Sequence, residues 1–330
     1  MKRYGVYLLA AAAGLAGQAF AQSTAQNQAQ NRAPADIKLE VLPVQGNVYI
    51  IAGAGGNIAV QIGQQGVLVV DTGLAGTSDK VLAEIRKLSD KPIQYILNTH
   101  FHADHTGGNA ALRKAGVTIT GANVTGNLTD AGVGAQIIAH LNVLNRMSAP
   151  TGEQSPTPPD AWPTDTEFIG NHKDLYFNDE VVQMLHQPAA HTDGDSLVWF
   201  RKSDVIAAGD IFVTTSYPYI DVDHGGSIQG EIDALNNIID IMVPKHEEEG
   251  GTYIIPGHGR ICDEWEVVEF RDMVTIIRDR VQAEIKAGKT LAQIKQDHLT
   301  KDYDARYNAK TGFGTSDQFL EAIYKSLTKK

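Results

Sequence analysis

The 330-residue chain is poor in cysteine and has no surplus of basic side chains. Cys262 is the only cysteine, so no disulfide can form within the chain and a thiolate-rich structural zinc site is not available. Lys and Arg number 28 against 39 Asp and Glu, which gives a formal net charge of −11. Because such an acidic chain repels phosphate backbones, nucleic acid is not an expected partner.

Long uncharged apolar runs are also missing after the N-terminus, so no segment of the mature protein is expected to span a membrane. The N-terminus has Lys2 and Arg3, a short apolar run at 7–15 and then Ala19-Phe20-Ala21. This pattern is typical of a secretory signal peptide at 1–21, cleaved after Ala21, and it predicts a periplasmic or secreted protein. Residues 22–36 are rich in Gln, Asn and Ala without periodicity and are predicted to be a disordered leader.

Hydrophobic patterns predict an α/β domain over 37–261, followed by C-terminal helices at 262–330 that pack on the same domain. In the first half, strands are expected at 37–44, 47–51, 57–62, 66–70, 93–97 and 117–120, and helices at 78–88, 110–114 and 128–147. In the second half, strands are expected at 174–177, 181–186, 197–201, 205–208 and 252–255, and helices at 228–243, 264–286 and 317–327.

Two connections each allow two interpretations. The glycine-rich segment 52–56 joins two predicted strands and is either a plain turn or a mobile flap over a site. The segment 148–165 is rich in Pro, Ser and Thr, and it is either a lid, with Trp162 as its apolar contact, or a surface loop.

The segment His100-Phe101-His102-Ala103-Asp104-His105 contains four potential metal ligands in six residues. Histidines two residues apart on an extended chain point to the same side, and a turn after Ala103 would direct Asp104 and His105 to a second point. One loop can therefore supply ligands to two metal ions.

Three further residues of this chemistry, His191, Asp210 and His258, also follow predicted strands, and sites in such sheets gather at the carboxyl ends of strands. Imidazole and carboxylate are the ligands that Zn²⁺ selects where thiolate is absent. The remaining histidines are expected on the surface or in structural roles, apart from His224, which follows the Asp210 segment.

The set His100-x-His102-x-Asp104-His105, His191, Gly209-Asp210 and Gly257-His258-Gly259, preceded by Asp71-Thr72-Gly73, resembles the metallo-β-lactamase superfamily. The resemblance covers 47–259 in order and implies an αβ/βα sandwich of two similar halves with a dinuclear zinc site along one edge. It implies that His100, His102 and His191 bind one Zn²⁺, that Asp104, His105 and His258 bind the other, and that Asp210 bridges them. Asp71 would orient a ligand imidazole, with a polar turn as its alternative role.

The resemblance also implies a hydrolase in which Asp104 and Asp210 are the catalytic residues. A hydroxide held between the two metal ions would attack a polarised carbonyl, and water or Asp104 would protonate the leaving group. Typical zinc β-lactamases resemble this chain but carry Cys or Ser at the position of Asp210, so the aspartate favours the wider branch of lactonases, thioesterases and phosphoesterases.

The expected substrate is a small molecule with a cyclic or activated ester or amide, such as a lactone, a thioester or a β-lactam. Tyr217, Tyr219 and His224 are candidates for contacting it, with core packing as the alternative role of the tyrosines. Because the signal peptide and the acidic charge speak against intracellular phosphoesterases, these are not expected.

Two other classes stay open. A mononuclear iron oxidoreductase, similar to the persulfide dioxygenases of the superfamily, would use fewer of the same side chains as ligands. A non-catalytic periplasmic protein would bind metal structurally or bind a partner through the C-terminal helices. Metal analysis separates the first class and turnover assays separate the second, while oligomeric state is not predicted.

Overall fold

The computed structural model describes residues 37–117, 134–150, 155–163, 168–246, 250–310 and 312–329. The chain divides into Met1–Ile37 and Lys38–Lys330, and all elements below belong to the second unit. The predicted signal peptide and leader lie outside the described residues, as do 118–120 of a predicted strand, 128–133 of a predicted helix, and parts of the connection 148–165. Within the described ranges, no helix has the length and apolar character needed to cross a membrane.

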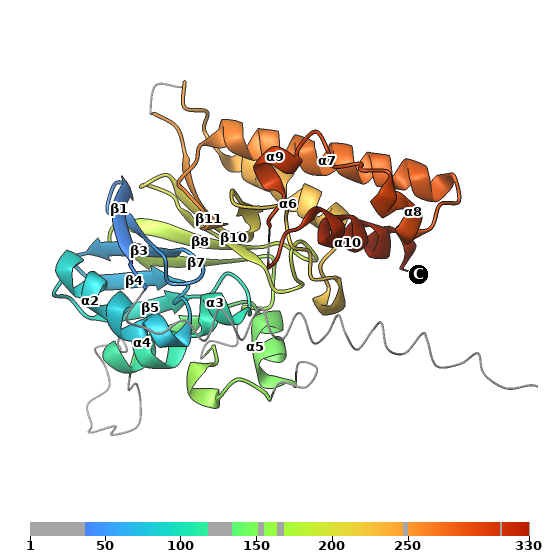
Figure 1. The fold of residues 1–330 in the computed structure, drawn as a ribbon. Helices are drawn as coiled ribbons and strands as arrows, with labels where there is room; N and C mark the ends of the chain where they lie inside the picture. Colours follow the sequence, from blue (N-terminus) through green and yellow to red (C-terminus); the bar gives the residue numbers. More distant parts are fainter. Residues whose placement is uncertain are drawn as a thin grey trace, which may run out of the picture. The chain divides into compact units, whose positions relative to one another are not determined.

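Two β-sheets form the centre of this unit (Figure 1). The first sheet consists of β1 (Glu40–Gln45), β2 (Val48–Ala52), β3 (Ile58–Gly63), β4 (Gly66–Val70), β5 (Ile93–Leu97) and β6 (Gln136–Ile138), in that order. The second sheet has the order β11 (Tyr253–His258), β10 (Val205–Val213), β9 (Ser196–Phe200), β8 (Glu180–His186) and β7 (His172–Phe177). The pairs β4–β5, β5–β6 and β10–β11 are parallel and the other pairs are antiparallel.

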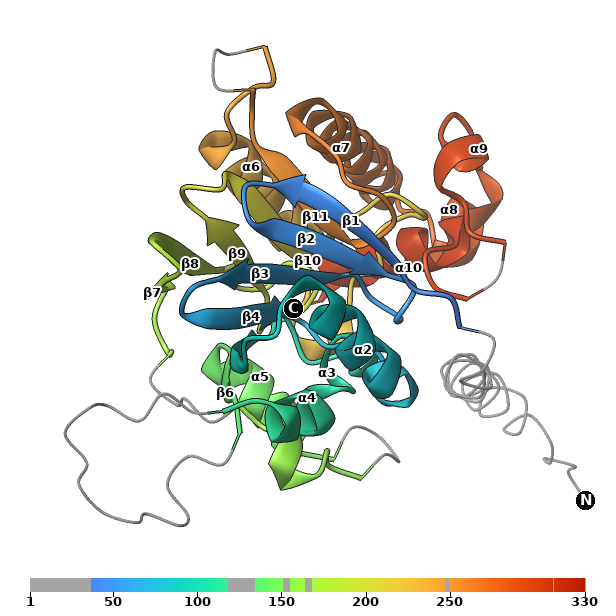
Figure 2. The same cartoon turned by 90° about the vertical axis from the view of Figure 1, so that its left-hand side faces the viewer.

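Strand β4 shows how the layers arise, because its side chains alternate between two apolar cores. Leu68 and Val70 pack between the two sheets. Val67 and Val69 point the other way, into a core with residues of α2 (Ser78–Leu88) and α4 (Asn109–Ala115). Figure 2 shows both helices against one face of this sheet.

Strand β10 repeats this arrangement in the second sheet. Val205 and Ala207 pack between the sheets, whereas Ile206 and Ala208 belong to a core shared with α6 (Ile228–Ile241), α7 (Glu264–Lys286) and α10 (Ser316–Thr328). The layers are therefore helix, sheet, sheet, helix, which is the αβ/βα sandwich expected from the sequence. Phe319 and Leu320 of α10 lie in the same core as Phe212 of β10.

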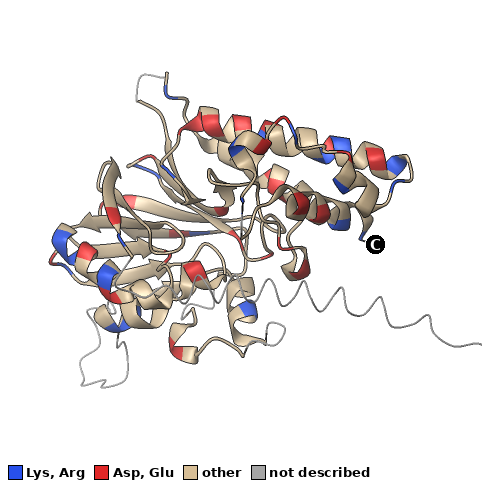
Figure 3. Cartoon of the chain, in the orientation of Figure 1, with Lys and Arg blue, Asp and Glu red and all other residues tan. Residues whose placement is uncertain are grey.

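The helices that cover the second sheet have well-defined starts. Asp263 and Glu266 form a capping box at the start of α7, and Thr315 and Gln318 form one at the start of α10. Short helices complete the unit: α3 (Ala103–Thr106), α5 (Leu141–Ser148), α8 (Leu291–Gln296) and α9 (Asp304–Tyr307). Figure 3 shows acidic and basic residues interspersed along α7, as expected of a helix with one face in water.

Two expectations about elements near the candidate site are wrong. Residues 136–138 form strand β6 rather than part of a helix, because Ile137 and Ile138 pair in parallel with Ile96 and Leu97 of β5 and are buried there. Strand β10 continues to Val213 instead of ending at Ala208, after an irregularity in its pairing with β11 between Ala207 and Gly209. Asp210 therefore lies within the strand, beyond the irregular step.

Candidate metal centre

Four segments bring all seven predicted metal ligands together near the carboxyl ends of the central strands. The segment after β5 supplies four of them, two before α3 and two within it, the β8–β9 connection supplies His191, and β10 and β11 supply Asp210 and His258. Two groups of donor atoms result, each within 4.8 Å of one another: His100, His102, His191 and Asp210 in one, and Asp104, His105 and His258 in the other. We call these the three-histidine cluster and the Asp104 cluster.

Asp210 faces both clusters. Its Oδ1 lies 3.2 Å from Nε2 of His105 and 3.4 Å from Nε2 of His258. Its Oδ2 lies 3.8 Å from Nε2 of His191, on the side of the three-histidine cluster. A carboxylate with one oxygen toward each group is suited to bridge two cations.

The donor atoms also meet the requirements of a metal site. Among the described residues, three buried atoms of the clusters have no hydrogen-bond partner: Nε2 of His100, Nε2 of His105 and Oδ1 of Asp210. Leaving such groups unpaired in the interior is costly, and imidazole nitrogen and carboxylate oxygen are the ligands typical of zinc. The residues present therefore fit two metal ions that share Asp210.

Burial keeps two imidazoles of the three-histidine cluster, those of His100 and His191, neutral. Burial, together with the neighbouring His105 and His191, lowers the pKa of His100 well below its usual value. Burial and the adjacent His102 lower the pKa of His191 to about 4. Neutral imidazole is the form that binds a metal ion, so these two side chains are ready to do so.

The Asp104 cluster has the opposite charge balance. Although burial lowers the pKa of each histidine, Asp210 and Asp104 raise that of His105 well above its usual value and that of His258 to about 10. Burial raises the pKa of Asp104 and of Asp210, but the adjacent histidines outweigh it and bring both below the usual range. Two ionised carboxylates gathered beside each other, one of them partly exposed, favour a cation between them.

The aspartate at the end of β4 holds the ligand loop. Asp71 accepts hydrogen bonds from the backbone N–H of Thr99 at 2.8 Å, from the Thr99 hydroxyl at 2.7 Å and from Nδ1 of His105 at 2.8 Å. The Thr99 hydroxyl in turn lies 3.0 Å from Nδ1 of His100. Both histidines thereby turn Nε2 toward the cluster, and Thr99 is a contributor that sequence reasoning missed.

The glycine-rich connection 52–56 packs directly against the Asp104 cluster. The Gly56 N–H donates to the carbonyl of Asp104 at 3.0 Å, and a Cβ atom on Gly56 would lie 2.4 Å from Cε1 of His105. The next residue, Asn57, donates from its side chain to the carbonyls of Pro256 and Gly259 on either side of His258. Close approach to the ligand side chains thus explains why Gly56 is a glycine.

The three candidates for substrate contact occupy different places. Tyr217 is fully buried and its hydroxyl lies 3.0 Å from the carbonyl of Thr300, so it takes the alternative role of core packing. The Tyr219 ring lies 5.8 Å from that of His191, and its carbonyl accepts a hydrogen bond from Nδ1 of His191. His224 lies at the rim of the centre with its side chain 23% exposed.

Two more residues near the centre were missed by sequence reasoning. Asp221 is buried and accepts hydrogen bonds from Nε2 of His102 and Nδ1 of His224. The ring of Phe313, in the connection before α10, lies 5.0 Å from the ring of Tyr219 and is tilted against it by 54°. A search for carboxylates between Tyr219 and His224 would have found Asp221, whereas no local pattern marks Phe313.

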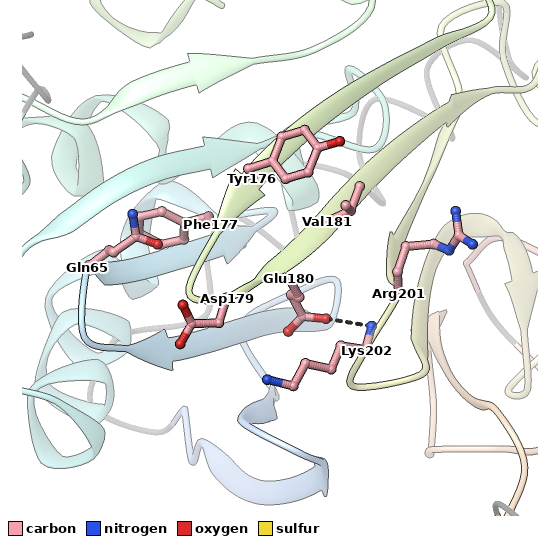
Figure 4. A pocket seen from close by; sticks show the side chains of 8 residues that line it. All are labelled: Gln65, Tyr176, Phe177, Asp179, Glu180, Val181, Arg201 and Lys202. Carbon is pink, nitrogen blue, oxygen red and sulfur yellow. Dashed lines mark hydrogen bonds between the residues drawn. The ribbon is translucent and has the colours of Figure 1, made fainter.

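A separate hollow of about 510 Å³ lies at the opposite end of the strands (Figure 4). It is lined by Tyr176, Glu180, Arg201 and Lys202, among others, near the start of β8 and β10. The Glu180 carboxylate already accepts the backbone N–H of Lys202 at 3.1 Å and the Ser203 hydroxyl at 2.8 Å. Since β10 carries Asp210 toward its other end, this hollow takes no part in the metal centre.

Comparison with known proteins places the seven residues in a wider context. Residues 41–258 match the family described as "Metallo-beta-lactamase superfamily". A linear primary-alkylsulfatase from Pseudomonas sp. (strain ATCC 19151) is 24% identical over 290 residues, covering 79% of this chain and 53% of that protein. A metallo-beta-lactamase type 2 from Bacillus sp. (strain 170) is 20% identical over 212 residues, covering 64% of this chain and 69% of that protein. The chain spans about half the length of the alkylsulfatase.

Solved structures show the same fold. A double mutant of the sec-alkyl sulfatase PisA1 superposes with a TM-score of 0.62 at 15% identity, covering 88% of this chain and 50% of that chain. A metallo-beta-lactamase from Pontibacter korlensis superposes with a TM-score of 0.53 at 14% identity, covering 72% of this chain and 99% of that chain. At these identities the likeness concerns the fold alone.

Proposed function

The chain belongs to the metallo-β-lactamase superfamily, and from this premise we propose that it is a dinuclear zinc hydrolase. Its reaction would be the hydrolytic opening of a cyclic or activated ester or amide in a small molecule: a lactone, a thioester or a β-lactam. The observation that carries the proposal is the placement of Asp210, with one oxygen toward each cluster. If only one ion were bound, the donor atoms of the other cluster would have no cation to bind.

In this proposal the three-histidine cluster holds one Zn²⁺, the Asp104 cluster holds the other, and Asp210 is shared. When bound there, two such ions would supply Lewis-acid chemistry, which lowers the pKa of water toward neutrality and polarises a carbonyl oxygen. The protein fixes the donors beforehand: His105 is completely buried, and its Nδ1 is held by Asp71, so Nε2 needs no reorganisation.

The open side of the centre indicates where the substrate approaches. The side chains of Asp104 and His258 are 34% and 31% exposed, whereas His100, His105 and His191 are buried. Asp104 Oδ2 lies 3.2 Å from Nε2 of His258 and is reached from solvent, so this carboxylate would take up the proton released by the attacking water and pass it to the leaving oxygen or nitrogen. Asp104 and Asp210 are therefore the proposed catalytic residues.

Partners and location belong to the same proposal. The acidic charge of −11 supports a small-molecule substrate rather than nucleic acid. Tyr219, packed against Phe313 and near His191, would face an apolar part of that substrate, and His224 would face it from the rim. The N-terminal pattern at 1–21 supports export to the periplasm or beyond.

Hydrolysis of a sulfate ester is a second candidate function. One observation favours it: the alkylsulfatase relative aligns with 79% of this chain, against 64% for the metallo-beta-lactamase from Bacillus sp. (strain 170). The same two clusters would serve, since a sulfate ester also places developing negative charge on oxygen.

A substrate panel with metal analysis tests both candidates. The purified protein would be mixed with a chromogenic cephalosporin, lactones, thioesters, primary alkyl sulfates and, in the presence of oxygen, a small persulfide, with zinc and iron measured on the same sample. Two zinc ions with turnover of a lactone, a thioester or the cephalosporin would support the leading proposal. Turnover of alkyl sulfates alone would favour the second. One iron ion with oxidation of a persulfide would replace both with the oxidoreductase, and two zinc ions without any turnover would leave a non-catalytic metal-binding protein.

A further inference from the structure

Asp221 joins a buried histidine of the three-histidine cluster to a histidine at the rim. Its Oδ2 lies 3.1 Å from Nε2 of His102 and 2.7 Å from Nδ1 of His224, so one oxygen accepts from both imidazoles. Its backbone N–H donates to the carbonyl of His191 at 2.8 Å, and its Oδ1 accepts the His224 N–H at 3.2 Å. Two imidazoles and a backbone N–H thus hold the carboxylate, and among the described residues His102 is the cluster side chain with which it forms a hydrogen bond.

The contact determines which nitrogen of His102 faces the cluster. Because Nε2 is turned to Asp221, Nδ1 is the atom that points inward, 2.9 Å from Nε2 of His191. His100 and His105 are oriented the other way round, with Nδ1 held by Thr99 and Asp71. His102 therefore depends on a support of its own, separate from the Asp71 network.

The rim histidine completes the chain of contacts. The Phe101 ring packs at 4.5 Å from the ring of His102 and 5.1 Å from that of His224. The His224 carbonyl accepts the N–H of Asp193, whose carboxylate is paired with Arg146 at 2.6 Å. Asp223 and Arg146 are the other charged residues that act on His224. His224 is consequently fixed in position without any contact to the donor atoms of either cluster.

We propose that Asp221 is a positioning residue for the three-histidine cluster, and that His224 at the rim holds the Asp221 carboxylate in place. The pair would raise the affinity of this cluster for its metal ion through His102 alone, and leave the Asp104 cluster unaffected. This inference rests on the proposed function, since His102 must be a metal ligand. An outer carboxylate on a ligand imidazole fixes the ring and increases its basicity.

Zinc titration of the full-length protein tests the inference. Asp221→Asn should weaken binding of one zinc equivalent by about 10- to 100-fold and leave the other equivalent unchanged. His224→Gln should weaken binding of the same zinc equivalent by a smaller factor. This variant still tests the inference if Asp221→Asn does not fold. Asp233→Asn is the matched control, because it is the same substitution at an exposed carboxylate of α6 that accepts a hydrogen bond from Gln229, and both affinities should stay the same.

A double-mutant cycle shows whether Asp221 acts through His102. In a His102→Ala background, Asp221→Asn should have no further effect on zinc affinity, whereas in a His258→Ala background it should keep its full effect. Equal losses in both backgrounds, or unchanged affinity in Asp221→Asn, would overturn the inference. The outcome is separable from the proposed function: two zinc equivalents without turnover would refute the hydrolase and leave the positioning role standing. A wild-type protein that binds no zinc would refute both.

Discussion

The Asp71 carboxylate accepts a 2.8 Å hydrogen bond from Nδ1 of His105, and the same carboxylate reaches His100 through the Thr99 hydroxyl. Asp71 has a φ of 62°, a left-handed conformation that costs a non-glycine residue roughly 1–3 kcal/mol. Three hydrogen bonds to its side chain offset this cost. One buried carboxylate at the end of β4 therefore orders one histidine of each cluster.

Asp71→Asn is expected to weaken the binding of both metal ions, because the amide cannot accept from His105 and Thr99 as a carboxylate does. The loss should be about 10- to 100-fold for each ion, measured by zinc titration. Asparagine tolerates positive φ, so the backbone conformation should be kept. Loss of only the Asp104-cluster ion would show that the Thr99 relay to His100 contributes nothing.

Asp104→Ala is expected to lower kcat by at least about 100-fold, because it removes a proposed ligand and the proposed proton donor together. Asp104 is partly exposed, so the melting temperature of the metal-free variant should be close to that of the metal-free wild type. Steady-state kinetics and circular dichroism measure the two effects. Retained turnover with wild-type stability would mean that the Asp104 cluster is not catalytic.

Chelation of the metal ions is expected to lower stability as well as activity. Ions that bind only the folded chain stabilise it by about 2.7 kcal/mol when their free concentration is one hundred times their dissociation constant. Their removal also leaves the buried nitrogens of His100 and His105 without partners. Thermal unfolding with and without dipicolinate measures the change, and added zinc should restore both quantities. An unchanged melting temperature would contradict a buried metal centre.

Much of the fold is predictable from local patterns. The helix over Ser78–Leu88 has the predicted bounds, because Val81 and Ile85 are spaced for one buried face. The strand β6 is not predictable in this way, because adjacent isoleucines fit either periodicity and the parallel pairing with β5, distant in sequence, decides between them. Element boundaries set by non-local pairing, such as the end of β10, fail for the same reason.

In the candidate site, too, residues close in sequence are predictable and contacts between distant residues are not. The segment His100 to His105 is conspicuous in sequence because four donors fall in six residues, and the structure brings them to His191, Asp210 and His258. Asp221 is inconspicuous, since its relation to His102 exists only after residues 119 positions apart have been folded together. No spacing of residues in the sequence predicts supporting contacts of this kind.

Gly56→Ala is expected to disturb the Asp104 cluster, because the added methyl group would lie 2.4 Å from Cε1 of a completely buried His105. We expect a destabilisation of about 1–3 kcal/mol and a weaker affinity for zinc. Gly76→Ala is the matched control, since no atom lies within 4 Å of its added Cβ. Denaturant unfolding and zinc titration of both variants measure the effects, and equal behaviour of the two would contradict the close packing of 52–56 on the ligands.

Glu231→Gln is expected to change how stability depends on pH. Glu231 is completely buried in the first turn of α6, and both carboxylate oxygens lack hydrogen-bond partners among the described residues. Burial, followed by Asp195 and Asp210, raises the pKa of Glu231 well above its usual value. The folded chain thus holds this proton more tightly than the unfolded chain, and unfolding releases it.

The free energy of unfolding should therefore fall as pH rises above the unfolded pKa of about 4.3, by at most about 1.4 kcal/mol per pH unit from this group. Glutamine cannot ionise, so the stability of Glu231→Gln relative to wild type should increase between pH 5 and pH 8 in urea unfolding experiments. Ser227→Ala, at the N-cap of the same helix, removes no charge and should lower stability by the same amount, about 1 kcal/mol, at every pH. A Glu231→Gln difference that is equally constant with pH would show that Glu231 is ionised in the folded chain, with a cation or water beside it.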